Sequence, residues 1–137
     1  MSSYSNPRVA EQVLARDVPQ PAPPPGDTPA DALLAEVLIE GEGEPAAAGN
    51  TVVVHYVGAL DDGSVFDQSW ARGETFPVTL GQGQVIAGWD RGLVGARLGE
   101  RRRLVIGSDN AYGTRGAGGV IPPNAPLAFE VDVLDIR

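Results

Sequence analysis

Residues 51–67, TVVVHYVGALDDGSVFD, decide the fold of this 137-residue chain. Residues 51–58 are rich in β-branched and aromatic side chains, which fit a pleated strand. The pair Asp62-Gly63 follows, and it tolerates the positive backbone angles that a tight hairpin turn needs. Val65-Phe66-Asp67 then begins the returning strand. The stretch therefore predicts an antiparallel β-hairpin.

More strand-like segments lie on either side of this hairpin. Some are short apolar runs, and others alternate apolar with less apolar or polar residues, as half-buried strands do. They fall at residues 37–39, 76–80, 104–106 and 127–133.

One short helix is expected among these strands, at residues 85–94, VIAGWDRGLV. Ile86, Trp89 and Leu93 share one helical face, and Gly95 is a natural stop. A long Gly- and Pro-rich loop over residues 107–126 precedes the last strand. The elements together predict an α+β fold, in which a largely antiparallel β-sheet is covered by one short α-helix.

Residues 1–31 differ in composition from the rest of the chain. Seven of the twelve prolines lie before residue 30. The run at 19–29, PQPAPPPGDTP, cannot hold a helix or a central strand. We expect a disordered extension over 1–31, with a marginal helical turn at residues 9–18, and one folded domain over 32–137. The alternative is an arm that docks on a partner or on the chain itself.

The composition excludes several kinds of chemistry. The chain has no cysteine and no lysine, and its only histidine is His55. Thiolate or multi-histidine metal sites and Schiff-base lysines are therefore excluded, and we expect neither metal nor cofactor. The net charge of −8 argues against nucleic-acid binding. No apolar stretch is long enough to span a membrane, and no signal-peptide pattern is present, so we expect a cytoplasmic protein.

His55 leaves two interpretations open. It shares a strand face with Val53 and Val57, where a lone histidine is usually a hydrogen-bonded core residue. A hydrolase would need a serine and an acid beside it, and no G-x-S-x-G motif occurs. The Asp61-Asp62 pair lies in the predicted turn, which favours backbone hydrogen bonding over acid–base catalysis.

Three consecutive arginines open the strand at residues 104–106. Strand alternation predicts that Arg101 and Arg103 face solvent. Arg102 has the parity of the core residues, and we expect its guanidinium to reach water at the end of the strand.

Six aromatic residues are spread over the predicted elements. They either form the core or converge on one apolar pocket, the usual form of a ligand site. They are Tyr56, Phe66, Phe76, Trp89, Tyr112 and Phe129.

Several motifs now follow one another in a characteristic order. They read VVHYVGALDDGSVFDQS (53–69), FPVTLGQGQVIAGWDRGLVG (76–95), LGERRRLVI (98–106), AYG (111–113) and VIPPNAPLAFEVDVLDI (120–136). Their order and spacing closely resemble the FKBP family of macrolide-binding peptidyl-prolyl isomerases over residues 35–137. The resemblance implies an antiparallel sheet wrapped around one short helix. It also implies a monomer that acts on proline-containing polypeptides and binds macrolide inhibitors such as rapamycin.

The resemblance further implies a pocket where the sheet meets the helix. Trp89 would form its floor, and the backbone N–H of Ile86 and the hydroxyl of Tyr112 would bind substrate carbonyls. Asp67 would be a polar group at the back of the pocket. The substrate-binding positions would be Tyr56, Phe66, Phe76, Val85, Ile121 and Phe129. The chain departs from familiar members at Val78, where an aromatic is common, and at the loop tip Ala117-Gly118.

Rotation about an Xaa–Pro amide changes no covalent bond, so this chemistry needs no nucleophile, metal or cofactor. That suits a chain without cysteine or lysine. A binding module of the same fold, which grips prolyl segments with little turnover, is the alternative function.

Overall fold

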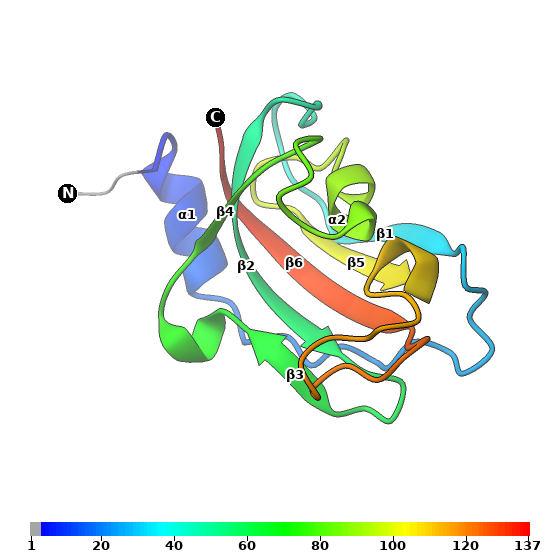
Figure 1. Ribbon diagram of the computed structural model, residues 1–137. Helices are drawn as coiled ribbons and strands as arrows, with labels where there is room; N and C mark the ends of the chain where they lie inside the picture. The colour runs from blue at the N-terminus through cyan, green and yellow to red at the C-terminus, as the bar shows by residue number, and fades with distance from the viewer. Residues whose placement is uncertain (1–3) are drawn as a thin grey trace.

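The computed structural model describes residues 4–137, and Figure 1 shows a twisted antiparallel sheet with helices on both of its faces. The strand order is β1-β5-β6-β2-β3, and β4 also pairs with β2. The elements along the chain are α1 (Pro7–Leu14), β1 (Leu33–Ile39), β2 (Thr51–Ala59), β3 (Val65–Gln68), η1 (Trp70–Arg72), β4 (Phe76–Thr79), α2 (Ala87–Gly92), β5 (Arg101–Ile106), η2 (Ser108–Asn110) and β6 (Leu127–Ile136).

The predicted hairpin forms as expected from the sequence. β2 and β3 pair antiparallel, with Gly58 opposite Asp67. Gly63 has a φ of 88°, and Asp62 accepts a hydrogen bond from the Ser64 N–H at 2.9 Å. Asp62 therefore binds the backbone of the turn, and the α+β fold class is confirmed.

The helix between β4 and β5 is shorter than the sequence predicts. Ile86 is still extended, with a ψ of 150°, so α2 begins at Ala87 and Leu93 ends it. Gly88 lets the helix approach the sheet, because a Cβ there would lie 2.5 Å from the Ile106 side chain. The short helix is thus seated directly on β5.

β2 is buried on both faces, since strand neighbours point alternately to opposite sides. Val52, Val54 and Tyr56 belong to the core between the sheet and α2. His55 and Val57 face the other way and are also buried. A second layer must therefore cover the back of the sheet.

Residues 4–31 provide this layer, which differs from the disordered extension expected from the sequence. Asn6 caps α1 by accepting a hydrogen bond from the Val9 N–H, and Pro7 occupies the first turn. Val9, Ala10 and Val13 are buried against Leu134 of β6. The helix therefore draws its stability from tertiary packing rather than from its length.

The proline-rich run continues across the same face as an extended strap, defined here as residues 15–31. Its prolines 19, 21 and 24 are buried. Arg101 donates to the carbonyl of Asp17 at 3.0 Å, and Arg103 donates to that of Ala22 at 2.7 Å. These two arginines were expected to face solvent, but they bind the strap, because an arginine fork matches carbonyl groups that proline-rich backbone leaves unpaired.

Arg102 lies on the core face, as predicted, but its guanidinium does not reach water. It is buried and forms an ion pair with Glu100 at 2.6 Å. It also donates to the carbonyls of Gly92 and Val94 at the end of α2. Paired in this way, its charge is satisfied inside the protein.

No helix within residues 4–137 is long and apolar enough to cross a membrane. Within the same range, no cluster of three or more histidine, aspartate or glutamate side chains could hold a metal ion.

Candidate functional site

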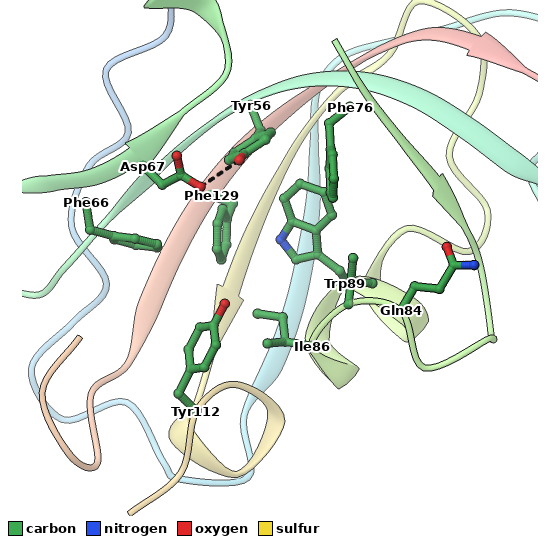
Figure 2. A pocket seen from close by; sticks show the side chains of 10 residues that line it. Tyr56, Phe66, Asp67, Phe76, Gln84, Ile86, Trp89, Tyr112 and Phe129 are labelled. Atoms are coloured by element: carbon green, nitrogen blue, oxygen red, sulfur yellow. Dashed lines mark hydrogen bonds between the residues drawn. The ribbon is translucent and has the colours of Figure 1, made fainter. Parts of the chain in front are cut away.

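A cavity of about 210 Å³ opens between α2 and the concave face of the sheet. Figure 2 shows that its walls are mostly aromatic and that polar groups stand at its edge. Nine of the ten site residues expected from the sequence line it. The lining residues are Tyr56, Phe66, Asp67, Phe76, Gln84, Val85, Ile86, Trp89, Tyr112 and Phe129.

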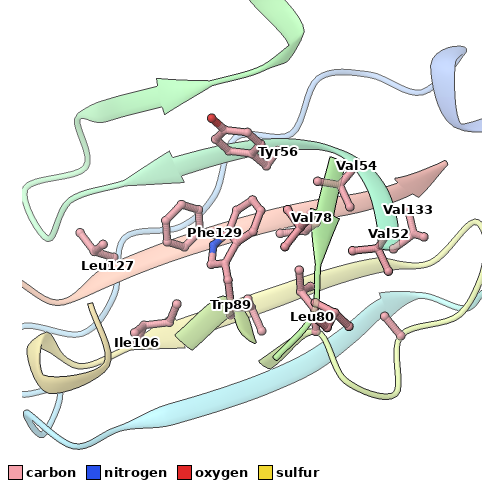
Figure 3. Close-up of a cluster of buried hydrophobic side chains, with 14 of the residues drawn as sticks. Val52, Val54, Tyr56, Val78, Leu80, Trp89, Ile106, Leu127, Phe129 and Val133 are labelled. Carbon is pink, nitrogen blue, oxygen red and sulfur yellow. The ribbon is translucent and has the colours of Figure 1, made fainter. Parts of the chain in front are cut away.

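Trp89 forms the floor of the cavity and also belongs to the core (Figure 3), with only 3% of its surface exposed. Its ring meets the edges of two neighbours, Tyr56 at 5.1 Å and Phe129 at 5.3 Å between ring centres. Such edge-to-face pairs add stability beyond burial. The tryptophan is therefore held rigidly in the lining of the cavity.

Phe66 and Phe129 form one wall, with their rings edge to face at 5.6 Å. Gly58 of β2 makes this arrangement possible. A Cβ at this position would lie 2.7 Å from atoms of both phenylalanines. The missing side chain thus creates the space that the two rings occupy.

The polar side of the cavity is a network of Tyr56, Asp67 and Arg72. The Tyr56 hydroxyl donates to Asp67 Oδ2 at 2.6 Å, and Arg72 Nη1 donates to Asp67 Oδ1 at 2.7 Å. Arg72 Nη2 also reaches the Tyr56 hydroxyl oxygen at 3.1 Å. The network fixes the carboxylate and turns the tyrosine ring toward the cavity.

The charges of this network follow from its hydrogen bonds. Burial works to raise the pKa of Asp67, but hydrogen bonds from Tyr56 and Arg72 outweigh it and hold the pKa below its usual value. Burial and the hydrogen bond to Asp67 raise the pKa of Tyr56. At neutral pH the carboxyl is therefore ionised, and the phenol keeps its proton.

Tyr112 follows η2 and directs its hydroxyl toward the cavity (Figure 2). It is 40% exposed, so it can meet a ligand at the rim. Burial, and then the charge of Asp67, raise the pKa of Tyr112. Its hydroxyl is therefore a hydrogen-bond donor throughout the neutral range.

The segment before α2 is tethered to the helix by one carboxylate. Asp90 accepts hydrogen bonds from the N–H groups of Gly81 and Gly83, at 3.1 and 2.9 Å. This tether orders the chain that leads to Val85 and Ile86, which line the cavity.

The structure departs from the sequence-derived site at three residues. Ile121 lies outside the lining, buried in the core and paired with Ala117 across the long loop. Gln84 lines the cavity and Arg72 organises its polar side, and neither residue was predicted from the sequence. Arg72 follows Asp67 by five residues, a spacing that could have suggested a pair once η1 was recognised.

His55 is remote from the cavity, because it points to the opposite face of β2 from Tyr56. Its Nδ1 lies 2.7 Å from Ser69 Oγ, and its ring stacks on Trp70 at 4.3 Å. Burial lowers the pKa of His55 most, and Arg72 lowers it further, against an opposing effect of Asp132. The core interpretation of His55 thus fits the structure.

Comparison with known proteins assigns the chain to a family. The sequence model of the FKBP-type peptidyl-prolyl cis-trans isomerases matches residues 42–134. The chain belongs to this family. It is 50% identical over 104 residues to an FK506-binding protein of Neisseria meningitidis serogroup A, with 76% of this chain and 95% of that protein covered.

Two further relatives support the assignment. FK506-binding protein 1 of Dictyostelium discoideum is 48% identical over 101 residues, covering 74% of this chain and 94% of the relative. An FK506-binding protein of Streptomyces anulatus is 48% identical over 115 residues, covering 82% and 92%. This FKBP is therefore a peptidyl-prolyl cis-trans isomerase, and the resemblance noted in its motifs is confirmed.

Proposed function

We propose that the aromatic cavity is the site of isomerisation and that the proline ring of a polypeptide substrate rests on Trp89. The observation that carries this proposal is the combination of a rigid, buried indole floor with hydrogen-bond donors at the rim. An apolar floor selects the proline ring, and the rim donors orient the chain on either side of it.

The cavity can lower the barrier to rotation without covalent chemistry. Amide resonance gives this rotation a barrier of about 18–20 kcal/mol. The planar amide is more polar than the twisted one, so an apolar surface that excludes water favours the twisted form. Each 1.36 kcal/mol or so removed from the barrier speeds the reaction about tenfold.

Individual residues have distinct roles in this proposal. Trp89 is the floor, and the Ile86 N–H and the Tyr112 hydroxyl donate to substrate carbonyls. Asp67, held by Arg72, is the polar group at the back. The side walls and entrance are formed by Tyr56, Phe66, Phe76, Val85 and Phe129.

The same cavity would bind macrolides. Relatives that are about half identical are named for binding FK506, and an apolar pocket of this kind suits the large apolar surface of such ligands. We further propose a cytoplasmic monomer whose substrates are proline-containing polypeptides. Turnover on folding chains would then assist protein folding.

The test is cis–trans exchange of a short Xaa-Pro peptide, followed by NMR with and without FK506. Accelerated exchange that FK506 abolishes supports the site. Trp89→Leu should lose the acceleration and Asp61→Ala, in the distant turn, should keep it. Equal loss in both variants, with intact folds, would remove Trp89 from the site.

A binding module is the second candidate function, and the loop tip Ala117-Gly118 is the feature that favours it. Tight FK506 binding without accelerated exchange would support it.

A further inference from the structure

Trp70 connects the N-terminal layer to the wall of the cavity. On one side its ring stacks on His55, with 4.3 Å between ring centres and 19° between planes. On another side it packs against the cluster formed by Val9, Val13 and Leu134. It is the first residue of η1, so the cluster built by α1 and Leu134 of β6, together with the His55 ring of β2, fixes where this turn lies.

Arg72 ends the same turn, two residues later. Its guanidinium donates to Asp67 and reaches the Tyr56 hydroxyl, and it lies 5.9 Å from the centre of the Tyr56 ring. Asp67 and Tyr56 both line the cavity. A shift of η1 would therefore displace Asp67 and Tyr56 in the wall of the cavity.

Arg72 needs such an anchor, because its own contacts are weak in isolation. Its side chain is 48% exposed, and exposed ion pairs lose much of their energy to solvent screening and to side-chain freedom. Hydrogen bonds between Ser69 and two residues of β2, His55 and Tyr56, fix the start of the turn. The packing of Trp70 holds the rest of the turn, which carries Arg72.

We infer that helix α1 is a remote part of the substrate site. By packing on Trp70 it fixes η1, and through Arg72 it sets the position of Asp67 and Tyr56. Trp70 is thus a positioning residue that acts through Arg72, and the N-terminal extension tunes the affinity of the cavity as well as covering the sheet. This inference rests on the proposed site.

A double-mutant cycle tests the pathway in the full-length chain, with FK506 as the ligand. Trp70→Ala and Arg72→Ala should each weaken binding about fivefold, since each frees the same carboxylate and phenol. The double variant should bind no worse than Arg72→Ala alone. Trp70→Phe, which keeps an aromatic ring on His55, should restore most of the affinity. Additive losses, or an unchanged affinity in Arg72→Ala, would overturn the inference.

Two further measurements separate this coupling from general loosening of the fold. Val13→Ala, at the α1 contact, should weaken FK506 binding, whereas Arg103→Gln, which frees the strap elsewhere, should not. The NMR signals of the Arg72 Nη–H groups, which donate to Asp67 and Tyr56, should shift much further in Trp70→Ala than in Trp70→Phe. An unmoved signal in Trp70→Ala would refute the coupling. Failure of the wild type to catalyse exchange or bind FK506 would instead refute the proposed function.

Discussion

The Arg102 guanidinium donates to the carbonyl of Gly92, the last residue of α2, at 2.9 Å. A buried cation therefore stands at the end of the helix where the backbone dipole is negative and carbonyls lack helical partners. The other end of this helix carries Ile86 and Trp89 to the cavity. Arg102 thus holds the C-terminal end of α2 in place, opposite to the end that carries the cavity residues.

We expect Arg102→Met to destabilise the protein by about 3–5 kcal/mol, because Glu100 would be left buried without its partner. Arg103→Met is the matched control. It removes an outer contact to the strap and should cost about 1 kcal/mol or less. Urea denaturation measures both values. Similar costs for the two variants would show that the buried pair contributes little.

Gly58→Ala should distort the wall of the cavity but leave the hydrogen-bonded pairing of the strands intact. The new Cβ would press on Phe66 and Phe129, at a cost of about 1–3 kcal/mol, and would displace one wall. FK506 affinity should fall about tenfold. Gly26→Ala is the control, because a Cβ there meets no atom within 4 Å. Unchanged affinity in Gly58→Ala would mean that the wall does not contact the ligand.

Tyr112→Phe should leave the fold intact and weaken substrate binding modestly. The side chain is partly exposed, so only one rim hydrogen bond is lost, worth about 0.5–1.5 kcal/mol. Peptide exchange rates at several substrate concentrations measure the effect. If kcat and KM both stay at wild-type values, Tyr112 does not contact the substrate.

His55 should make the folded state less stable in mild acid. Its pKa is lowered in the folded protein, mainly by burial, so the unfolded chain binds the proton more readily. The stability that neutral His55 contributes is present above its unfolded pKa, about 6.5, and is lost as the pH falls toward the folded pKa. Glu130, whose pKa is raised mainly by burial, acts in the opposite sense.

The difference between wild type and His55→Gln isolates this contribution. Unfolding free energies at pH 7.5 and at pH 5 should show a larger loss in the wild type than in the variant. Equal losses would assign the acid sensitivity to other groups.

Local signals were sufficient for the hairpin, whereas they left the six aromatic residues open between a core and a cavity. The Asp62-Gly63 turn, the alternation around Phe129 and the spacing of Ile86 and Trp89 each depend on a few neighbouring residues. The family motifs then placed the cavity residues together. Gln84 and Arg72 were not predicted, because their roles depend on where η1 and the segment before α2 lie in the folded chain.

The N-terminal layer was expected as a disordered extension, with docking on the chain itself only as the alternative. Its prolines carry no helix or strand signal, and its docking depends on Arg101 and Arg103, far away in the sequence. The sequence did hold one indication. Val53 and Val57 are apolar on the face of β2 opposite to Val52 and Val54, which is typical of a strand covered on both sides.

The docked N-terminal layer also bears on where the family domain should be cut. The matched segment begins at residue 42, whereas the packing on the back of the sheet begins near residue 4. A chain trimmed to the matched segment would lose β1 from the edge of the sheet, and it would expose Val57, Leu134 and the ring of Trp70 to water. We expect such a chain to self-associate through the open apolar face and the unpaired edge of β5. Its solubility and oligomeric state would then not be those of the full chain.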